Sequence, residues 1–160
     1  MPHRYTPKPH QTEPVHATWV VAADAGRARI FSASKEEDRQ LEEVADFVNP
    51  DARLQDHDAM SDRRGHVVQG VAGVGHAFEP RQTHGEHIAE SFAKDLCHRL
   101  GTAQRNGEVA RIYLIADPRF LGLLRKNLDS ATHKLVVQET AADFSRHPAN
   151  EIRGLLPAVL

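Results

Sequence analysis

Apolar residues near the start of the chain occur in short runs separated by turn-forming residues, a pattern typical of strands. The run Trp19–Ala23 is continuously apolar, as expected of a strand that is covered on both faces. Asp24–Gly26 supplies turn chemistry, with Gly26 free to take a positive φ, and Arg27–Phe31 returns as a second strand. Leu41–Val48 predicts a third strand. The pattern therefore indicates a meander of three strands.

A helical period replaces the strand pattern after residue 82. Thr83 and Glu86 fit a capping box, in which each side chain accepts a hydrogen bond from the other residue's backbone N–H. Asn106-Gly107 is expected to end the helix by supplying a left-handed cap. Large apolar residues recur every four positions between these signals: Ile88, Phe92, Leu96 and Leu100. The spacing predicts a long helix with one apolar stripe that faces a sheet.

The last third of the chain alternates between strand and helix signals. Val109–Ala116 is a nearly unbroken apolar run and predicts a central strand. Asp117 is a candidate N-cap with Pro118 in the first helical turn, so a second helix follows. Leu135–Val137 predicts the last strand, and Pro148 is expected to start a final helix.

The predicted element order is strand, strand, strand, helix, strand, helix, strand, helix. Three meandering strands followed by two strands reached through helices is the ribonuclease H-like α/β arrangement, a mixed sheet with helices packed on it. Its first and fourth strands are parallel neighbours. Residues 18–160 are expected to form this domain, with a long irregular loop at 49–82. Residues 1–17, rich in proline, are expected to be a disordered tail.

Composition narrows the classes of partner. The chain has 20 lysine and arginine residues against 22 acidic residues, a net charge of -2, which argues against binding nucleic acid by bulk charge but allows a local basic patch. Cys97 is the only cysteine, so there is no internal disulfide or multi-cysteine zinc site, and we expect a buried, inert thiol. No apolar run approaches the roughly 20 residues of a membrane span, and no secretory signal is evident. We therefore expect a cytoplasmic protein that does not bind membranes.

Four segments resemble the bacterial host attachment protein family. They are TWVVAADAGRARIF (18–31), SDRRG (61–65), EHIAESFAKDL (86–96) and YLIADPRFLGLLR (113–125). The resemblance runs from about Thr18 to Ile152, and ADPRFLGLLR is its most specific part. The family is named for a requirement in attachment of a bacterium to its host, which describes a phenotype rather than a chemistry.

The family in turn resembles, more distantly, the middle domain of archaeal and eukaryotic class-I release factors. That domain has the same order of strands and helices, with a Gly-Gly-Gln loop before the long helix. Here residues 65–87 are glycine-rich but contain no Gly-Gly-Gln. The resemblance therefore does not imply peptide release, although it suggests binding to the ribosome, tRNA or another RNA.

Asp24 and Asp117 are the candidate metal ligands and catalytic residues. Both are expected at the carboxyl ends of parallel strands, the usual place for ligands in open α/β sheets. Ribonuclease H-like nucleases hold two Mg²⁺ ions with carboxylates in this region, but they need further carboxylates. Each residue also has a structural interpretation, because Asp24 is a turn former and Asp117 an N-cap.

Candidate binding residues border the irregular loop and the second predicted helix. If these segments meet, their side chains would form a phosphate-contacting face, whereas the alternative is a solvated mixture of charges. The candidates are Arg63, Arg64, Arg81, Gln82, His84, Arg119 and Arg125.

The leading hypothesis from the sequence is a non-enzymatic intracellular binding domain without a cofactor, associated with RNA, tRNA or the ribosome and needed indirectly for attachment to host cells. One alternative is a Mg²⁺-dependent nuclease or phosphotransfer enzyme that uses Asp24 and Asp117. The other is a protein–protein interaction module in adhesion or surface signalling. The ligand and the oligomeric state are left open.

Overall fold

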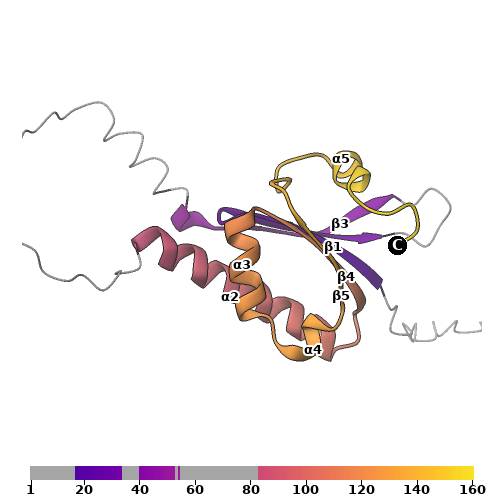
Figure 1. The fold of residues 1–160 in the computed structure, drawn as a ribbon, viewed down its shortest axis with the longest axis horizontal. Helices are drawn as coiled ribbons and strands as arrows, with labels where there is room; N and C mark the ends of the chain where they lie inside the picture. The colour runs from indigo at the N-terminus through magenta and orange to yellow at the C-terminus, as the bar shows by residue number, and fades with distance from the viewer. Residues whose placement is uncertain (1–16, 34–39, 53, 55–82) are drawn as a thin grey trace, which may run out of the picture.

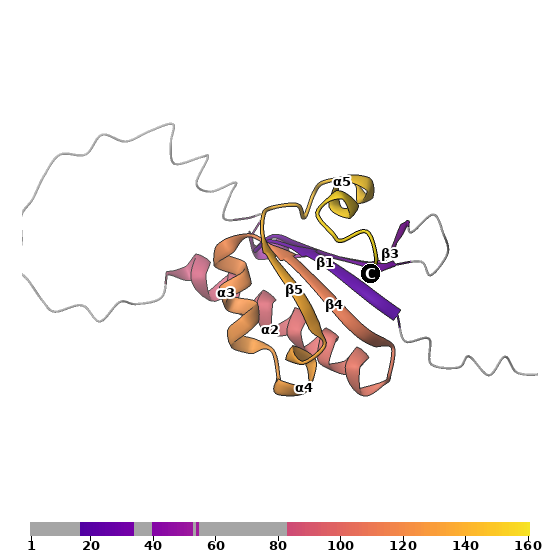
Figure 2. The same ribbon diagram turned by 45° about the vertical axis from the view of Figure 1, so that its right-hand side comes forward.

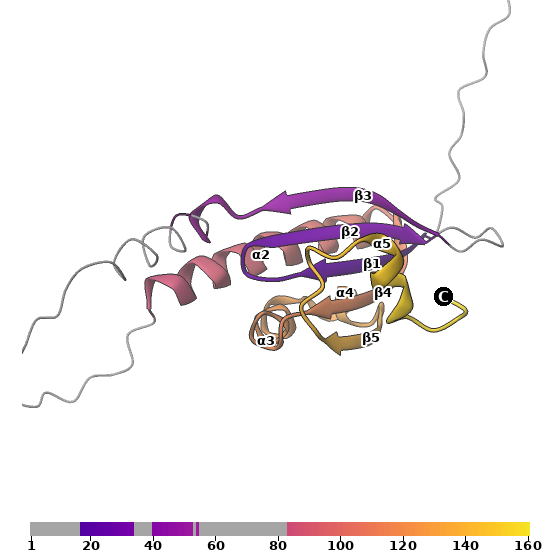
Figure 3. The same ribbon diagram turned by 90° about the horizontal axis from the view of Figure 1, so that it is seen from above.

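The computed structural model describes residues 17–33, 40–52, 54 and 83–160. Five strands form one mixed sheet in the order β3-β2-β1-β4-β5 (Figure 1; Figure 3). β2 is antiparallel to both β1 and β3, whereas β4 is parallel to both β1 and β5. This topology confirms the predicted ribonuclease H-like class, including the parallel pairing of the first and fourth strands. The strands are β1 (Ala17–Ala23), β2 (Arg27–Ala33), β3 (Leu41–Val48), β4 (Val109–Ala116) and β5 (Val136–Ala141).

Helices cover both faces of the sheet unequally. On one face lie α2 (His84–Arg105), α3 (Pro118–Asn127) and the short α4 (Ser130–His133). The other face carries α5 (Ala149–Gly154) and the chain around it (Figure 1; Figure 2). Two apolar clusters result, one on each face. None of the helices in the described ranges is both long and apolar enough to cross a bilayer.

The predicted signals at the ends of α2 are confirmed. The Thr83 hydroxyl accepts a hydrogen bond from the Glu86 N–H, and the Glu86 carboxylate accepts one from the Thr83 N–H. Past the other end, Gly107 adopts φ 71°, a left-handed conformation that L residues rarely adopt. Phe92 of α2 packs against Phe120 of α3, with ring centroids 5.8 Å apart. The two helices are thus fixed side by side on the sheet.

The structure differs from the sequence pattern at three points. Gly26 does not adopt a positive φ, because side-chain acceptors rather than a left-handed residue hold the β1–β2 turn. The last strand is Val136–Ala141 rather than 135–137, since polar residues at this sheet edge also pair with β4. Helix α4 was not expected; it is four residues long and depends on Asp129 as its cap. The predicted tail at 1–17, apart from residue 17, and most of the loop at 49–82 lie outside the described residues.

Gly101 of α2 lies close to α4 and its cap, Asp129. A Cβ atom there would lie 2.8 Å from Oδ2 of Asp129. That carboxylate is not free to move away, because it accepts hydrogen bonds from the Thr132 N–H at 2.7 Å and from the Thr132 hydroxyl at 3.0 Å. These hydrogen bonds also lower the pKa of Asp129 below its ordinary value. Only a residue without a side chain therefore fits at this point of α2.

Replacing Gly101 by alanine is expected to destabilise the protein by about 1–3 kcal/mol, the usual cost of overpacking. Gly122 of α3 is the matched control, because a Cβ there has no atom within 4 Å. Gly122→Ala should instead stabilise the protein by about 0.5–1 kcal/mol through its higher helix propensity. Urea unfolding measures both changes, and equal midpoints for the two variants would contradict the prediction.

Cys97 lies on the buried face of α2, as the sequence indicated. Its Sγ atom donates to the carbonyl oxygen of Leu124, and the side chain is buried. Burial, with a smaller contribution from the charge of Asp129, raises the pKa of this thiol to about 12. Because the thiolate is the reactive form, the thiol should be inert in the folded protein.

We expect an aromatic disulfide reagent at pH 8 to leave Cys97 unmodified in the folded protein over the time in which it fully modifies the urea-unfolded chain. Release of the coloured thiol product measures the reaction. Equal rates for folded and unfolded protein would show that the thiol is accessible and the interpretation wrong.

Candidate functional site

Three parallel strands end together at one edge of the sheet, which we call the carboxyl edge. The backbone N–H of Asp117 donates to the Ala23 carbonyl at 3.2 Å, and that of Ala142 donates to the Ala116 carbonyl at 2.9 Å. The residues that follow β1, β4 and β5 are therefore neighbours in space. In open α/β sheets, ligands bind at this edge.

Asp24 follows β1 and uses both carboxylate oxygens within the protein. Oδ1 accepts from the backbone N–H of Gly26 at 2.6 Å and of Arg27 at 2.8 Å, which closes the β1–β2 turn. Oδ2 accepts from the hydroxyl of Ser145, a residue 121 positions away in the sequence. Asp24 thus ties the hairpin turn to the segment that follows β5.

Asp117 follows β4 and caps α3. Its Oδ1 accepts from the backbone N–H of Arg119 at 3.0 Å and of Phe120 at 3.1 Å. In the part of the chain that the structure describes, no three histidine, cysteine or acidic side chains are grouped so that they could hold a metal ion. The structure therefore assigns Asp24 and Asp117 roles as acceptors for backbone and hydroxyl groups.

A cleft of about 740 Å³ opens at the carboxyl edge between the β1–β2 turn and the starts of α2 and α3. The first turns of α2 extend beyond the end of β1 (Figure 1; Figure 3). Residues of these turns line one side of the cleft. The lining combines apolar, polar and charged groups: Ala25, Thr83, Gly85, Glu86, Ala89, Asp117, Arg119, Phe120 and Leu123. Such a mixture is typical of small-molecule and nucleotide sites.

Arg119 is the cation of this cleft. It lies in the first turn of α3 and is exposed. Among the described residues, no acidic side chain lies within 4 Å of its guanidinium. Arg27, at the start of β2, differs: it forms a 2.7 Å ion pair with Asp46 and lowers the pKa of that carboxyl group. Within the described part of the chain, Arg119 thus has no acidic partner, whereas Arg27 is engaged.

The two other predicted binding residues that the structure describes do not line this cleft. Arg125 pairs with Glu139 of β5, with its Nε 2.6 Å from Oε2. His84 lines a second groove of about 670 Å³ between β3 and α2. Arg63, Arg64, Arg81 and Gln82 lie outside the described residues.

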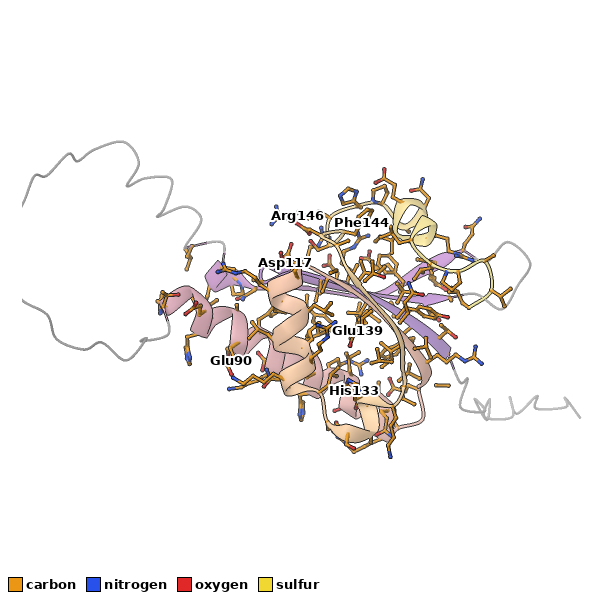
Figure 4. The ribbon with its side chains drawn as sticks, in the orientation of Figure 1. Glu90, Asp117, His133, Glu139, Phe144 and Arg146 are labelled. Atoms are coloured by element: carbon orange, nitrogen blue, oxygen red, sulfur yellow. The ribbon has the colours of Figure 1, made fainter. Side chains whose placement is uncertain are left out.

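Sequence reasoning missed the segment between β5 and α5. Ser145 is fully buried, and its hydroxyl oxygen also lies 3.2 Å from Oδ1 of Asp143. Arg146 next to it is exposed, on the side of the sheet that carries α5, and Asp117 marks the start of α3 (Figure 4). The rule that singled out Asp24 and Asp117, polar residues directly after a parallel strand, would have found this segment if β5 had been predicted to its full length.

The comparisons with known proteins confirm the family expected from the sequence. A family model described as "Protein required for attachment to host cells" matches residues 19–156. An uncharacterized protein of Rickettsia prowazekii (strain Madrid E) is 25% identical over 101 residues, which are 62% of this chain and 67% of that protein.

Among solved structures, the archaeal translation termination factor aRF1 is similar with a TM-score of 0.47 and 11% identity, covering 86% of this chain and 33% of that one. The chain thus spans about a third of that factor, and no activity follows from so distant a likeness. The family match covers most of the sequence, and the chain belongs to the family of proteins required for attachment to host cells.

Proposed function

We propose that this chain is a non-catalytic, intracellular RNA-binding domain and that RNA contacts the carboxyl edge of its sheet. The observation that carries the proposal is the cleft at this edge, in which Arg119 is exposed without an acidic partner among the described residues. The carboxylates that a nuclease would need are instead engaged by backbone N–H and hydroxyl groups. Arg119 is therefore the group of this lining that would contact an anion, while Asp117 and Glu86 serve as caps of α3 and α2.

The lining of the cleft supports a nucleotide as the ligand. Proteins recognise unpaired RNA by packing bases against apolar and aromatic side chains and by placing cations at the phosphates. Ala25, Ala89, Phe120 and Leu123 offer apolar surface, and Arg119 offers a fork of N–H donors that fits a phosphate group. The capped start of α3 fixes the backbone that carries this arginine.

The overall charge limits how the domain would bind. With a net charge of -2, attraction by bulk charge cannot supply the affinity. Binding must then depend on a few local contacts, and it should weaken strongly as salt concentration rises. An RNA-binding role inside the cell would affect attachment to host cells indirectly, through the synthesis or stability of other components.

We expect the full chain to bind a fluorescently labelled single-stranded RNA of mixed sequence at low salt. Arg119→Ala should weaken this binding about threefold to tenfold, as is typical for one lost phosphate contact. Arg111→Ala is the matched control, because Arg111 is also exposed but lies near the amino end of β4. Fluorescence anisotropy titrations measure all three affinities.

The proposal fails if the chain binds neither this RNA, nor tRNA, nor ribosomes at low salt. Equal losses in the Arg119 and Arg111 variants would place the RNA elsewhere on the surface. Shortening of the RNA after addition of Mg²⁺, absent in an Asp24→Asn variant, would instead favour the nuclease hypothesis. Recovery of a protein partner from nuclease-treated lysate, with no RNA binding, would favour an interaction module.

A further inference from the structure

Arg146 lies at the carboxyl edge on the opposite side of the β1–β2 turn from Arg119. Arg119 belongs to α3, on the face covered by α2 and α3. Arg146 belongs to the segment before α5 and lies on the side of the sheet that carries α5 (Figure 4). Ala25 of the turn lines the cleft with Arg119. The next residue, Gly26, is so close to Arg146 that an added Cβ atom would lie 3.9 Å from its Nη2. The two arginines therefore flank one tight turn.

Hydrogen bonds to the β1–β2 hairpin hold the turn that carries Arg146 against the sheet. The buried Ser145 hydroxyl donates to Asp24 Oδ2, whose partner oxygen closes the β1–β2 turn. Arg29 of β2 donates from Nη1 to the His147 carbonyl at 2.6 Å. The rings of Phe144 and His147 stack with centroids 4.3 Å apart. The backbone on both sides of Arg146 is thus fixed to the sheet, while its side chain stays exposed.

Arg146, like Arg119, has no acidic partner in the part of the chain that the structure describes. Among the described residues, no acidic side chain lies within 4 Å of its guanidinium, although Asp143 lies in the same segment and Asp24 of the β1–β2 turn is bonded to the neighbouring Ser145. Oδ2 of Asp24 instead accepts a hydrogen bond from the Ser145 hydroxyl. A cation held on a fixed backbone loses less conformational entropy when it binds than one on a mobile loop.

We infer that Arg146 is a second phosphate-contacting residue of the RNA-binding edge, and that Asp24 and Ser145 are its positioning residues. The inference rests on the proposed function and adds the side chain that would contact a phosphate on the α5 side of the carboxyl edge. One strand of RNA would cross the β1–β2 turn, with one phosphate at Arg119 and another at Arg146. Asp24 then serves binding by joining the turn to the Arg146 segment, rather than by holding a metal ion.

The experiment measures RNA affinity over a range of salt concentrations for the full chain and its variants. Arg146→Ala should weaken binding at least about threefold and lower the slope of log K against log salt by about 0.7, the value for one phosphate contact to single-stranded nucleic acid. Arg146→Lys keeps the charge and should keep most of the slope. Arg111→Ala should change neither quantity.

A double-mutant cycle tests the positioning role. Ser145→Ala should weaken binding because the turn is released, and Arg146→Ala added to it should then cost much less than it does alone. Ser145→Ala and Arg119→Ala should be additive, since those residues share no hydrogen bond. If Ser145→Ala weakens binding only because the protein fails to fold, the affinity it loses will not depend on whether Arg119 or Arg146 is also replaced.

The outcomes separate this inference from the proposed function. If Arg119→Ala weakens binding while Arg146→Ala leaves the affinity and the salt slope unchanged, the inference is wrong and the RNA-binding proposal stands. If the unmodified chain binds no RNA, both are wrong. Because Arg146 is exposed, its variants are expected to fold, so they decide the matter even if Ser145→Ala destabilises the protein.

Discussion

The burial of β1 and β4 on both faces is the constraint from which the remaining architecture follows. Val20 and Val21 of β1 point to opposite faces, and both are fully buried, as is Ile115 of β4. A pair of strands without a solvent-facing side needs a layer on each face and a neighbour on each edge. The long α2 with α3 supplies one layer, and α5 with its flanking chain supplies the other. β2 and β5 supply the neighbours.

The same constraint creates the carboxyl edge. Parallel strands end on the same side of a sheet, so the residues after β1, β4 and β5 converge although they are far apart in sequence. Asp24 and Asp117 both follow parallel strands at this edge. In this protein they cap a turn and a helix, and the exposed side chains near them include Glu86 and Asp143 as well as Arg119 and Arg146. The convergence of the strand ends therefore places polar and charged groups from distant parts of the sequence at one edge.

The sequence predicted those features that depend on neighbouring residues. The capping box at Thr83, the N-cap at Asp117 and the bounds of β4 rest on local patterns, and the structure reproduces them. The bond from Ser145 to Asp24 was not predictable, because it joins residues 121 positions apart and neither residue type requires it. The polar second half of β5 was missed for a related reason. At the edge of a sheet, pairing with β4 determines the strand, and an apolar pattern is not needed.

Because the two faces of the sheet are covered unequally, the C-terminal segment should detach more easily than the rest of the protein unfolds. A six-residue helix is too short to be stable in water by itself, so α5 persists only while it is docked. Its attachment depends on a small apolar cluster and on the links of Ser145 and the Arg29 guanidinium. Native-state hydrogen exchange should therefore identify the last twenty residues as a unit that detaches at a lower free energy than the rest unfolds. A ligand bound to the segment before α5 would slow that detachment. Binding at the carboxyl edge would therefore slow the exchange of amide protons on the face of the sheet that carries α5.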